Sequence, residues 1–174
     1  MTYKAILLGV GIAALIGPSA VADTLTRAPQ GSMLGELKFQ FDSAALQADA
    51  HPALDRAAAF ASANRDAKIV LDAHTDPIGA STYNVKLSIR RAESVRAKLT
   101  AMGVPGDQIV FAVYGEDGRL RASYADDRRV TMWSTREPMA ALIDRTFAGK
   151  GTAVTWQKPL SVAQIEGRSP VASR

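Results

Sequence analysis

Residues 74–99 read HTDPIGASTYNVKLSIRRAESVRAKL, an acidic turn that runs directly into an amphipathic helix. Pro77 and Gly79 favour a tight change of direction after a strand. Four apolar residues then recur at the spacing of one helix face: Ala92, Val95, Leu99 and Met102. Gly103 ends this helix and Pro105 prevents it from resuming. We expect a binding site where the turn meets the helix, with Ser81 or Thr82 as the helix cap.

The segments on either side of this stretch predict an α+β fold. An alanine-rich helix is expected from Pro52 to Ala63, with the proline in its first turn. Apolar alternation or β-branched composition marks four strands, at 37–42, 68–75, 108–115 and 127–134. The order β-α-β-α-β-loop-β predicts a single domain, about 36–135, with one mixed sheet and its helices packed on one face.

The N-terminus has the plan of a secretory signal peptide. Lys4 precedes the apolar run AILLGVGIAALIG at 5–17, and the small residues at 20–22 predict cleavage before Asp23. A retained membrane anchor is the alternative, but a spanning helix needs about 20 apolar residues. The protein is therefore expected to be exported, with no membrane span after cleavage; the family resemblance described below implies that it resides in the periplasm, at the outer membrane or cell wall.

Two further segments flank the predicted domain. Residues 23–35 are polar and contain Pro29 and Gly31, so we expect a flexible lead-in. Residues 136–174 are expected to form a C-terminal extension, a short helix at 137–147 followed by a loosely ordered tail. Its isolated apolar residues, including Trp156, leave open a role in docking an envelope protein.

Composition excludes several functional classes. The chain has no cysteine, which excludes disulfides, thiolate metal sites and lipid attachment through a cysteine. The formal net charge is only +4, and the basic residues alternate with acidic ones, so nucleic-acid binding is not indicated. With 47% hydrophobic and 22% charged residues, the composition is that of an ordinary globular protein.

Asp76 and Arg91 are the candidate binding pair. Asp76 lies between a strand and a helix, and Arg91 follows fifteen residues later, near the third turn of that helix. A carboxylate beside a guanidinium suits a zwitterion, because the acid accepts from an ammonium and the arginine forks onto a carboxylate. Backbone donors at the helix start near Thr82 favour an anionic group as well. Alternatively, Asp76 and Arg91 pair only with each other.

A family resemblance supports the same pair. The run at 73–116, together with FQFDSAAL at 39–46 and YADDRRV at 124–130, closely resembles the OmpA-like peptidoglycan-binding domain. Outer-membrane porin-type proteins, the peptidoglycan-associated lipoprotein and flagellar stator subunits share this domain. The resemblance covers about Leu37 to Ser134.

The resemblance implies a non-catalytic module that holds the stem peptide of peptidoglycan through diaminopimelate. It implies no cofactor. Asp76 and Arg91 match the aspartate and arginine that grip the ammonium and carboxylate of that residue. The other implied contacts are Asn84 and Arg128, with Thr75 and Leu87 flanking the cleft.

Two positions depart from the family pattern. Ala73 replaces a usual glycine before the HTD turn, which narrows the room beside the backbone. Asp127 replaces a usual asparagine, and an acid there is expected to pair with Arg128 or Arg91 and to compete with the ligand.

Enzymatic and metal-binding alternatives are weaker. A zinc site needs three or four protein ligands, whereas the chain offers two histidines, His51 and His74, and no cysteine. His74 is expected to make a structural hydrogen bond at a strand end. Ser81 and Ser88 lie in no nucleophile motif. Two alternatives remain: a subunit of an envelope machine that uses the domain as a wall anchor and 136–174 for partner binding, and a soluble amino acid binder.

Overall fold

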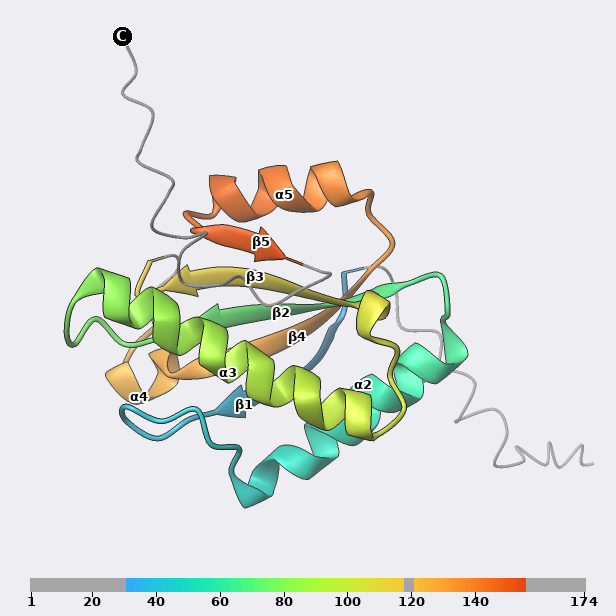
Figure 1. The fold of residues 1–174 in the computed structure, drawn as a ribbon, viewed down its shortest axis with the longest axis horizontal. Helices are drawn as coiled ribbons and strands as arrows, with labels where there is room; N and C mark the ends of the chain where they lie inside the picture. The colour runs from blue at the N-terminus through green and yellow to red at the C-terminus, as the bar shows by residue number, and fades with distance from the viewer. Residues whose placement is uncertain (1–30, 118–120, 156–174) are drawn as a thin grey trace, which may run out of the picture.

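A five-stranded mixed sheet forms the centre of the molecule in the computed structural model, which describes residues 31–117 and 121–155. Its strand order is β1-β4-β2-β3-β5 (Figure 1). The strands are β1 (Met33–Lys38), β2 (Lys68–His74), β3 (Ile109–Gly115), β4 (Arg129–Thr135) and β5 (Ala153–Thr155). Only β2 and β3 run parallel; the other neighbouring pairs are antiparallel. The predicted α+β class is confirmed.

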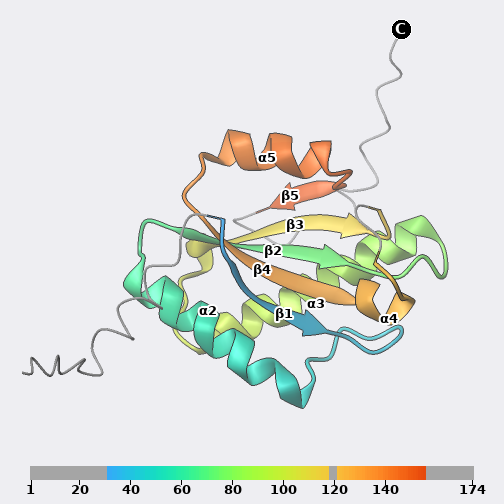
Figure 2. The ribbon, with the colours of Figure 1, turned by 180° about the vertical axis from the view of Figure 1, so that it is seen from behind.

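Helices α2 (His51–Ala63) and α3 (Ser81–Ala101) cover one face of the sheet (Figure 2). The core between them is almost entirely apolar and includes Phe60, Leu71, Val95 and Phe111. Gly35 lets α2 approach β1 closely, because a Cβ at this position would lie 2.7 Å from the Cβ of Ala53. The alanines of α2 therefore serve close helix-to-sheet packing.

The first strand begins earlier than predicted. β1 starts at Met33, inside the stretch expected to be a flexible lead-in, and it ends at Lys38. Phe41, predicted to lie on the buried face of this strand, is 57% exposed because the chain has already turned away from the sheet. The predicted signal peptide and residues 23–30 lie outside the described residues.

The described part of the C-terminal extension, 136–155, packs against the sheet and adds a strand to it. Helix α5 (Met139–Ala148) covers the second face, where Leu142 packs against Val70 and Val110. Strand β5, which was not predicted, pairs antiparallel with β3 and widens the sheet. The sheet therefore carries helices on both faces, and the prediction that they pack on one face only is wrong, because α5 covers the second. Trp156 and the rest of the expected tail lie outside the described residues.

Helix α3 begins without the predicted side-chain cap. Ala80 is the N-cap residue, and no side chain accepts from the first turn. The two short helical turns η1 (Ala48–Ala50) and η2 (Gly106–Gln108) precede α2 and β3, and α4 (Tyr124–Asp127) precedes β4. In the described part of the chain, no helix is long and apolar enough to cross a membrane.

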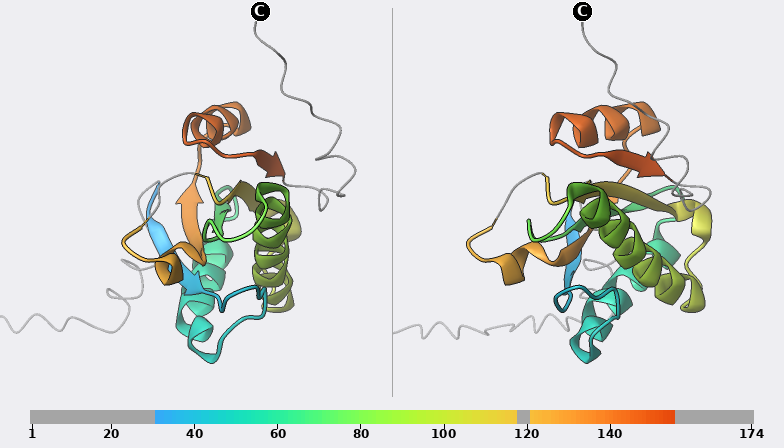
Figure 3. Two further views of the ribbon diagram at one scale, coloured as in Figure 1. Left: turned by 90° about the vertical axis from the view of Figure 1, so that its left-hand side faces the viewer. Right: turned by 60° about the vertical axis from the view of Figure 1, so that its left-hand side comes forward.

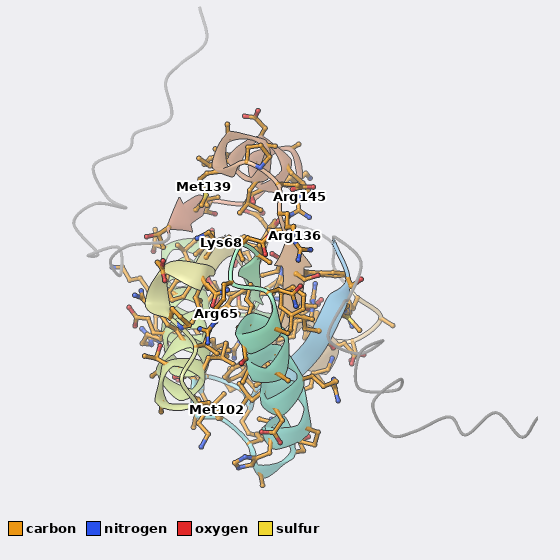
Figure 4. All side chains as sticks on the ribbon, turned by 90° about the vertical axis from the view of Figure 1, so that its right-hand side faces the viewer. Arg65, Lys68, Met102, Arg136, Met139 and Arg145 are labelled. Atoms are coloured by element: carbon orange, nitrogen blue, oxygen red, sulfur yellow. The ribbon has the colours of Figure 1, made fainter. Side chains whose placement is uncertain are left out.

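The end of the sheet where β2 begins and β4 finishes is held by polar contacts (Figure 4). Arg136 donates to the carboxylate of Asp66 at 2.8 Å and to the side-chain oxygen of Asn64 at 2.7 Å. Lys68 reaches the carbonyl of Asp107 at 2.8 Å. These bonds tie the turn after α2 to the exit of β4.

Leu142→Ala tests whether α5 is part of the cooperative fold. Leu142 is 1% exposed, so the truncation leaves a cavity and should lower the free energy of unfolding by about 2–4 kcal/mol. Phe147→Ala, on the exposed side of the same helix, is the matched control and should change it by less than about 0.5 kcal/mol. Urea titration followed by circular dichroism measures both. Equal, small effects would mean that α5 contributes no packing to the fold.

Candidate functional site

The carboxyl ends of β2 and β3 bring the polar residues of the candidate site together. Because these strands are parallel, Asp76 after β2 and Glu116 after β3 emerge at the same edge of the sheet. The N-terminus of α3, the loop after β1 and the short helix α4 converge on this end, which faces the viewer in Figure 3, left. Thr75 donates its backbone N–H to the carbonyl of Gly115 at 2.7 Å and so fixes the two strand ends.

Asp76 is ion-paired with Arg128 rather than with Arg91. One carboxylate oxygen of Asp76 lies 3.1 Å from Nη1 of Arg128, and the other accepts the backbone N–H of Ile78 at 3.2 Å. Asp76 is 4% exposed. The alternative in which Asp76 and Arg91 satisfy only each other is therefore wrong.

Arg91 is a fully buried arginine that bonds to backbone carbonyls. Its Nε donates to Ser43 at 2.9 Å, Nη1 to His74 at 2.8 Å and Nη2 to Gln40 at 3.2 Å. The guanidinium also lies 5.2 Å from the ring centroid of Phe39. Burial lowers the pKa of Arg91 to about 10, and the nearby carboxylate of Asp76 opposes this shift. Arg91 therefore remains charged at neutral pH, and it fastens the loop after β1 to the end of β2.

A small pocket of ≈ 170 Å³ lies between this loop and the start of α3. Arg91 forms part of its wall, and Asn84 and Leu87 line it from the helix. The remaining polar and apolar side chains of the lining include Phe41, Asp42, Asp76, Ile78 and Tyr83. Asp42 and Asp76 balance the charges of Arg91 and the adjoining Arg128, so the site matches a group that carries both signs.

Hydrogen bonds hold the helix side of the pocket. Nδ2 of Asn84 donates to Glu116 at 2.5 Å and to the carbonyl of Ile78 at 3.3 Å. The hydroxyl of Tyr83 bonds to Asp42, a residue with a positive φ of 51° in the loop after β1. This second bond links the loop to α3 across the pocket mouth.

Arg128 is held by a bond to the loop after β1, and the segment before it is anchored by ion pairs. Its Nε donates to the carbonyl of Phe39 at 3.3 Å. Its neighbours in the chain are held separately: Arg121 pairs with Glu36 at 2.7 Å, and Lys38 pairs with Asp126 at 3.0 Å. These ion pairs anchor the segment around α4, from which Arg128 reaches the pocket.

Asp127 does not compete for the arginines of the site. Its carboxylate lies 3.3 Å from Nη1 of Arg129 and accepts the backbone N–H of Arg121 at 2.8 Å. The expectation that Asp127 pairs with Arg128 or Arg91 is therefore wrong, because its carboxylate is bonded to Arg129 and to the backbone of Arg121 instead. Ala73 is fully buried in the core under the helices.

The structure thus brings the predicted residues together at one end of the sheet, although their contacts differ from those predicted. Thr75 is 1% exposed, and among the described residues its hydroxyl has no hydrogen-bond partner. Sequence reasoning missed Asp42, Glu116 and Tyr83. Glu116 was recognisable as a polar residue directly after a buried strand parallel to β2, whereas the positions of Asp42 and Tyr83 depend on how the loop after β1 folds.

His74 belongs to the scaffold. Its ring is 8% exposed and stacks on Tyr114, with centroids 4.6 Å apart. Burial lowers the pKa of His74 to about 3, so the ring is neutral at physiological pH. His51 is exposed at the start of α2. Within 31–117 and 121–155, no three histidine, aspartate or glutamate side chains are grouped closely enough to hold a metal ion.

The pH dependence of the free energy of unfolding tests the burial of two titratable side chains, His74 and Asp72. The unfolded chain protonates His74 near pH 6.5 and the folded protein only near pH 3, so acidification between these values costs stability, at most about 1.4 kcal/mol per pH unit. Burial raises the pKa of Asp72 from 3.8 to about 7, which gives the opposite slope between those values.

Acidification should therefore lower the free energy of unfolding of His74→Phe less than that of the wild type. It should lower that of Asp72→Asn more. Urea midpoints at pH 4.5, 5.5 and 6.5 measure the slopes, and His51→Gln, which replaces an exposed ring, is the control. If the slope of the urea midpoint against pH changed in the same direction in both variants, the opposite pKa shifts of His74 and Asp72 would be contradicted.

Arg91→Lys tests the structural role of the buried guanidinium. A lysine cannot reproduce the fork that reaches three carbonyls, so we expect the free energy of unfolding to fall by about 2–4 kcal/mol. Arg90→Lys, at the exposed neighbouring position, should cost less than about 0.5 kcal/mol. Thermal and urea denaturation of the two proteins measure the difference. Similar stability would show that Arg91 does not fasten the loop.

Comparison with known proteins places this geometry in a family. Residues 38–131, more than half of the chain, match the model of the OmpA family. The chain is 34% identical over 99 residues to the peptidoglycan-associated lipoprotein of Pasteurella multocida, covering 54% of this chain and 66% of that protein. It is 33% identical over 135 residues to the protein of the same name from Pseudomonas putida, covering 70% and 81%.

Solved structures agree on the fold. The peptidoglycan-associated lipoprotein from Burkholderia pseudomallei matches with a TM-score of 0.52 at 29% identity, over 57% of this chain and 89% of that one. The periplasmic domain of Helicobacter pylori MotB (residues 90–256) matches with a TM-score of 0.52 at 21% identity, over 70% and 86%. This second likeness concerns the fold alone.

The mixed sheet with α2 and α3 on one face therefore defines an α+β domain of a kind found in bacterial cell-envelope proteins. The chain belongs to the OmpA family, as the sequence motifs predicted, and like that family it is non-catalytic.

Proposed function

We propose that this protein binds peptidoglycan non-covalently, through the diaminopimelate of the stem peptide, and so tethers itself to the cell wall in the periplasm. The observation that carries the proposal is the pocket of Asp76: a buried carboxylate beside two guanidiniums, in a chain of the OmpA family. The relatives named above as peptidoglycan-associated support the choice of ligand.

The free end of diaminopimelate is a zwitterion, which suits the charges of the pocket. Its ammonium would bind Asp76, whose carboxylate already makes a charge-assisted bond with Arg128 at 3.1 Å. Its carboxylate would lie between Arg128 and the wall that Arg91 forms. Asn84, Thr75 and Leu87 would border the head group, and the buried hydroxyl of Thr75 offers it a further hydrogen bond.

Arg91 and Arg128 would then contribute in different ways. Arg91 supplies a fixed positive charge from the pocket wall, while three of its five N–H donors are already used by carbonyls. The side chain of Arg128 is 18% exposed, so it is the arginine with freedom to move from Asp76 onto an incoming carboxylate.

A second role, as the wall anchor of an envelope machine with a partner bound through 136–174, is compatible with this proposal. Met139–Ala148 and Ala153–Thr155 pack into the fold, so a partner would meet the outer surface of α5 or the residues beyond Thr155.

Titration calorimetry with a diaminopimelate muropeptide and its lysine counterpart tests the proposed function. Lysine lacks the second carboxylate, so the lysine peptide should bind about tenfold to hundredfold more weakly. Asp76→Asn keeps the shape of the side chain but removes its charge, and it should reduce affinity for the diaminopimelate peptide by a similar factor.

Asp66→Asn, an exposed acid near the opposite end of the sheet, is the matched control and should leave affinity unchanged. Equal affinity for the two peptides in the wild type would rule out recognition of the zwitterion. Unchanged binding by Asp76→Asn would remove Asp76 from the site.

A further inference from the structure

Three large side chains surround the mouth of the pocket and are exposed despite their apolar character. Phe41 in the loop after β1 is 57% exposed, Ile78 in the turn after β2 is 47% exposed, and Tyr83 on α3 is 41% exposed. All three also contribute to the pocket lining. We call Phe41, Ile78 and Tyr83 the apolar rim.

The pocket is too small for more than one ligand residue. Its ≈ 170 Å³ falls below the roughly 300–1,000 Å³ of sites that enclose drug-sized molecules. A stem peptide that inserts the free end of one residue must therefore leave the adjoining residues outside, at the mouth. The apolar rim is the surface that those residues meet first.

The chemistry of the rim selects between the two neighbours of diaminopimelate. On one side of it in the stem lies D-glutamate, which carries a free carboxylate. On the other lies D-alanine, which carries a methyl group and no free carboxylate when its carboxyl group is joined in an amide bond. Asp42 lies among the rim residues and is bonded to Tyr83, so it repels a second carboxylate. Apolar side chains gain by covering a methyl group, and exposed apolar clusters beside a pocket commonly extend its binding surface.

We propose that the apolar rim is a second subsite, which binds the D-alanine that follows diaminopimelate in the stem peptide. This inference rests on the proposed function, since it requires that the pocket hold diaminopimelate. It adds a preference: the protein distinguishes stems that retain D-alanine from stems trimmed back to diaminopimelate.

The loop after β1 is held firmly enough to present Phe41. Arg91 bonds to the carbonyls of Gln40 and Ser43 on either side of it, and Asp42 bonds to Tyr83. Phe41 is thus fixed at the mouth without being buried. A preorganised aromatic surface of this kind binds without the cost of ordering a loop.

The test compares tripeptide and tetrapeptide muropeptides, which end in diaminopimelate and in D-alanine, both with an amidated C-terminus so that neither presents a terminal carboxylate. The wild type should bind the tetrapeptide more tightly. In Phe41→Ser the ratio of tetrapeptide to tripeptide affinity should fall about fourfold, because burial of one methyl-sized group contributes about that factor. With both C-termini amidated, the two peptides carry the same number of carboxylates, and any remaining difference that is the same in both proteins cancels in the ratio of ratios. Ile78→Ser should shrink the preference in the same direction.

Phe147→Ser replaces an exposed phenylalanine on α5 and is the matched control, with an unchanged preference expected. An equal loss for both peptides in Phe41→Ser and Ile78→Ser would overturn the subsite, because the rim would then serve only the pocket. If the rim variants lost affinity only for peptides that carry the disaccharide, the subsite would also be overturned, because the rim would then bind the sugar. If the wild type binds neither peptide, the proposed function itself fails.

Discussion

The buried guanidinium of Arg91 is the interaction on which the end of this molecule depends. It joins carbonyls from the end of β2 and from two positions in the loop after β1, segments that are otherwise separated by a helix in the chain. Burying a charge costs free energy, and here three hydrogen bonds, the ring of Phe39 and the nearby carboxylate of Asp76 offset that cost. One residue therefore holds the loop, fixes the end of β2 and contributes a positive charge to the wall of the pocket.

The sequence predicted the parts of this arrangement that follow from local pattern. Periodicity placed α2, α3 and four strands within a few residues of their observed bounds, and the motif at 74–99 located the candidate site. Sequence spacing put Arg91 beside Asp76, but it did not distinguish a guanidinium facing a ligand from one that bonds to backbone carbonyls. That distinction depends on the loop at 39–47, which is held by contacts with α3 as well as by bonds among its own residues.

Long-range contacts also explain the other differences. A three-residue strand such as β5 has too little pattern to be recognised, and it exists because β3 offers it an unpaired edge. The pairing of Asp127 with Arg129 depends on α4, a four-residue helix whose last residue is Asp127 and whose position relative to β4 the strand pattern did not predict. Helix α5 covers Val70, Val110 and Ala112 on the second face of the sheet, and this contact depends on residues beyond the predicted domain.

The two outer strands of the sheet have a consequence for behaviour at high local concentration. An exposed edge strand can pair with the edge strand of another molecule, and a high local concentration of the protein would favour such association. Here β1 has an irregular register between Met33 and Gly35 and carries Glu36 and Lys38, while β5 is three residues long. Both outer strands are thus poor templates for edge-to-edge association, which lets copies accumulate side by side without aggregating through their sheets.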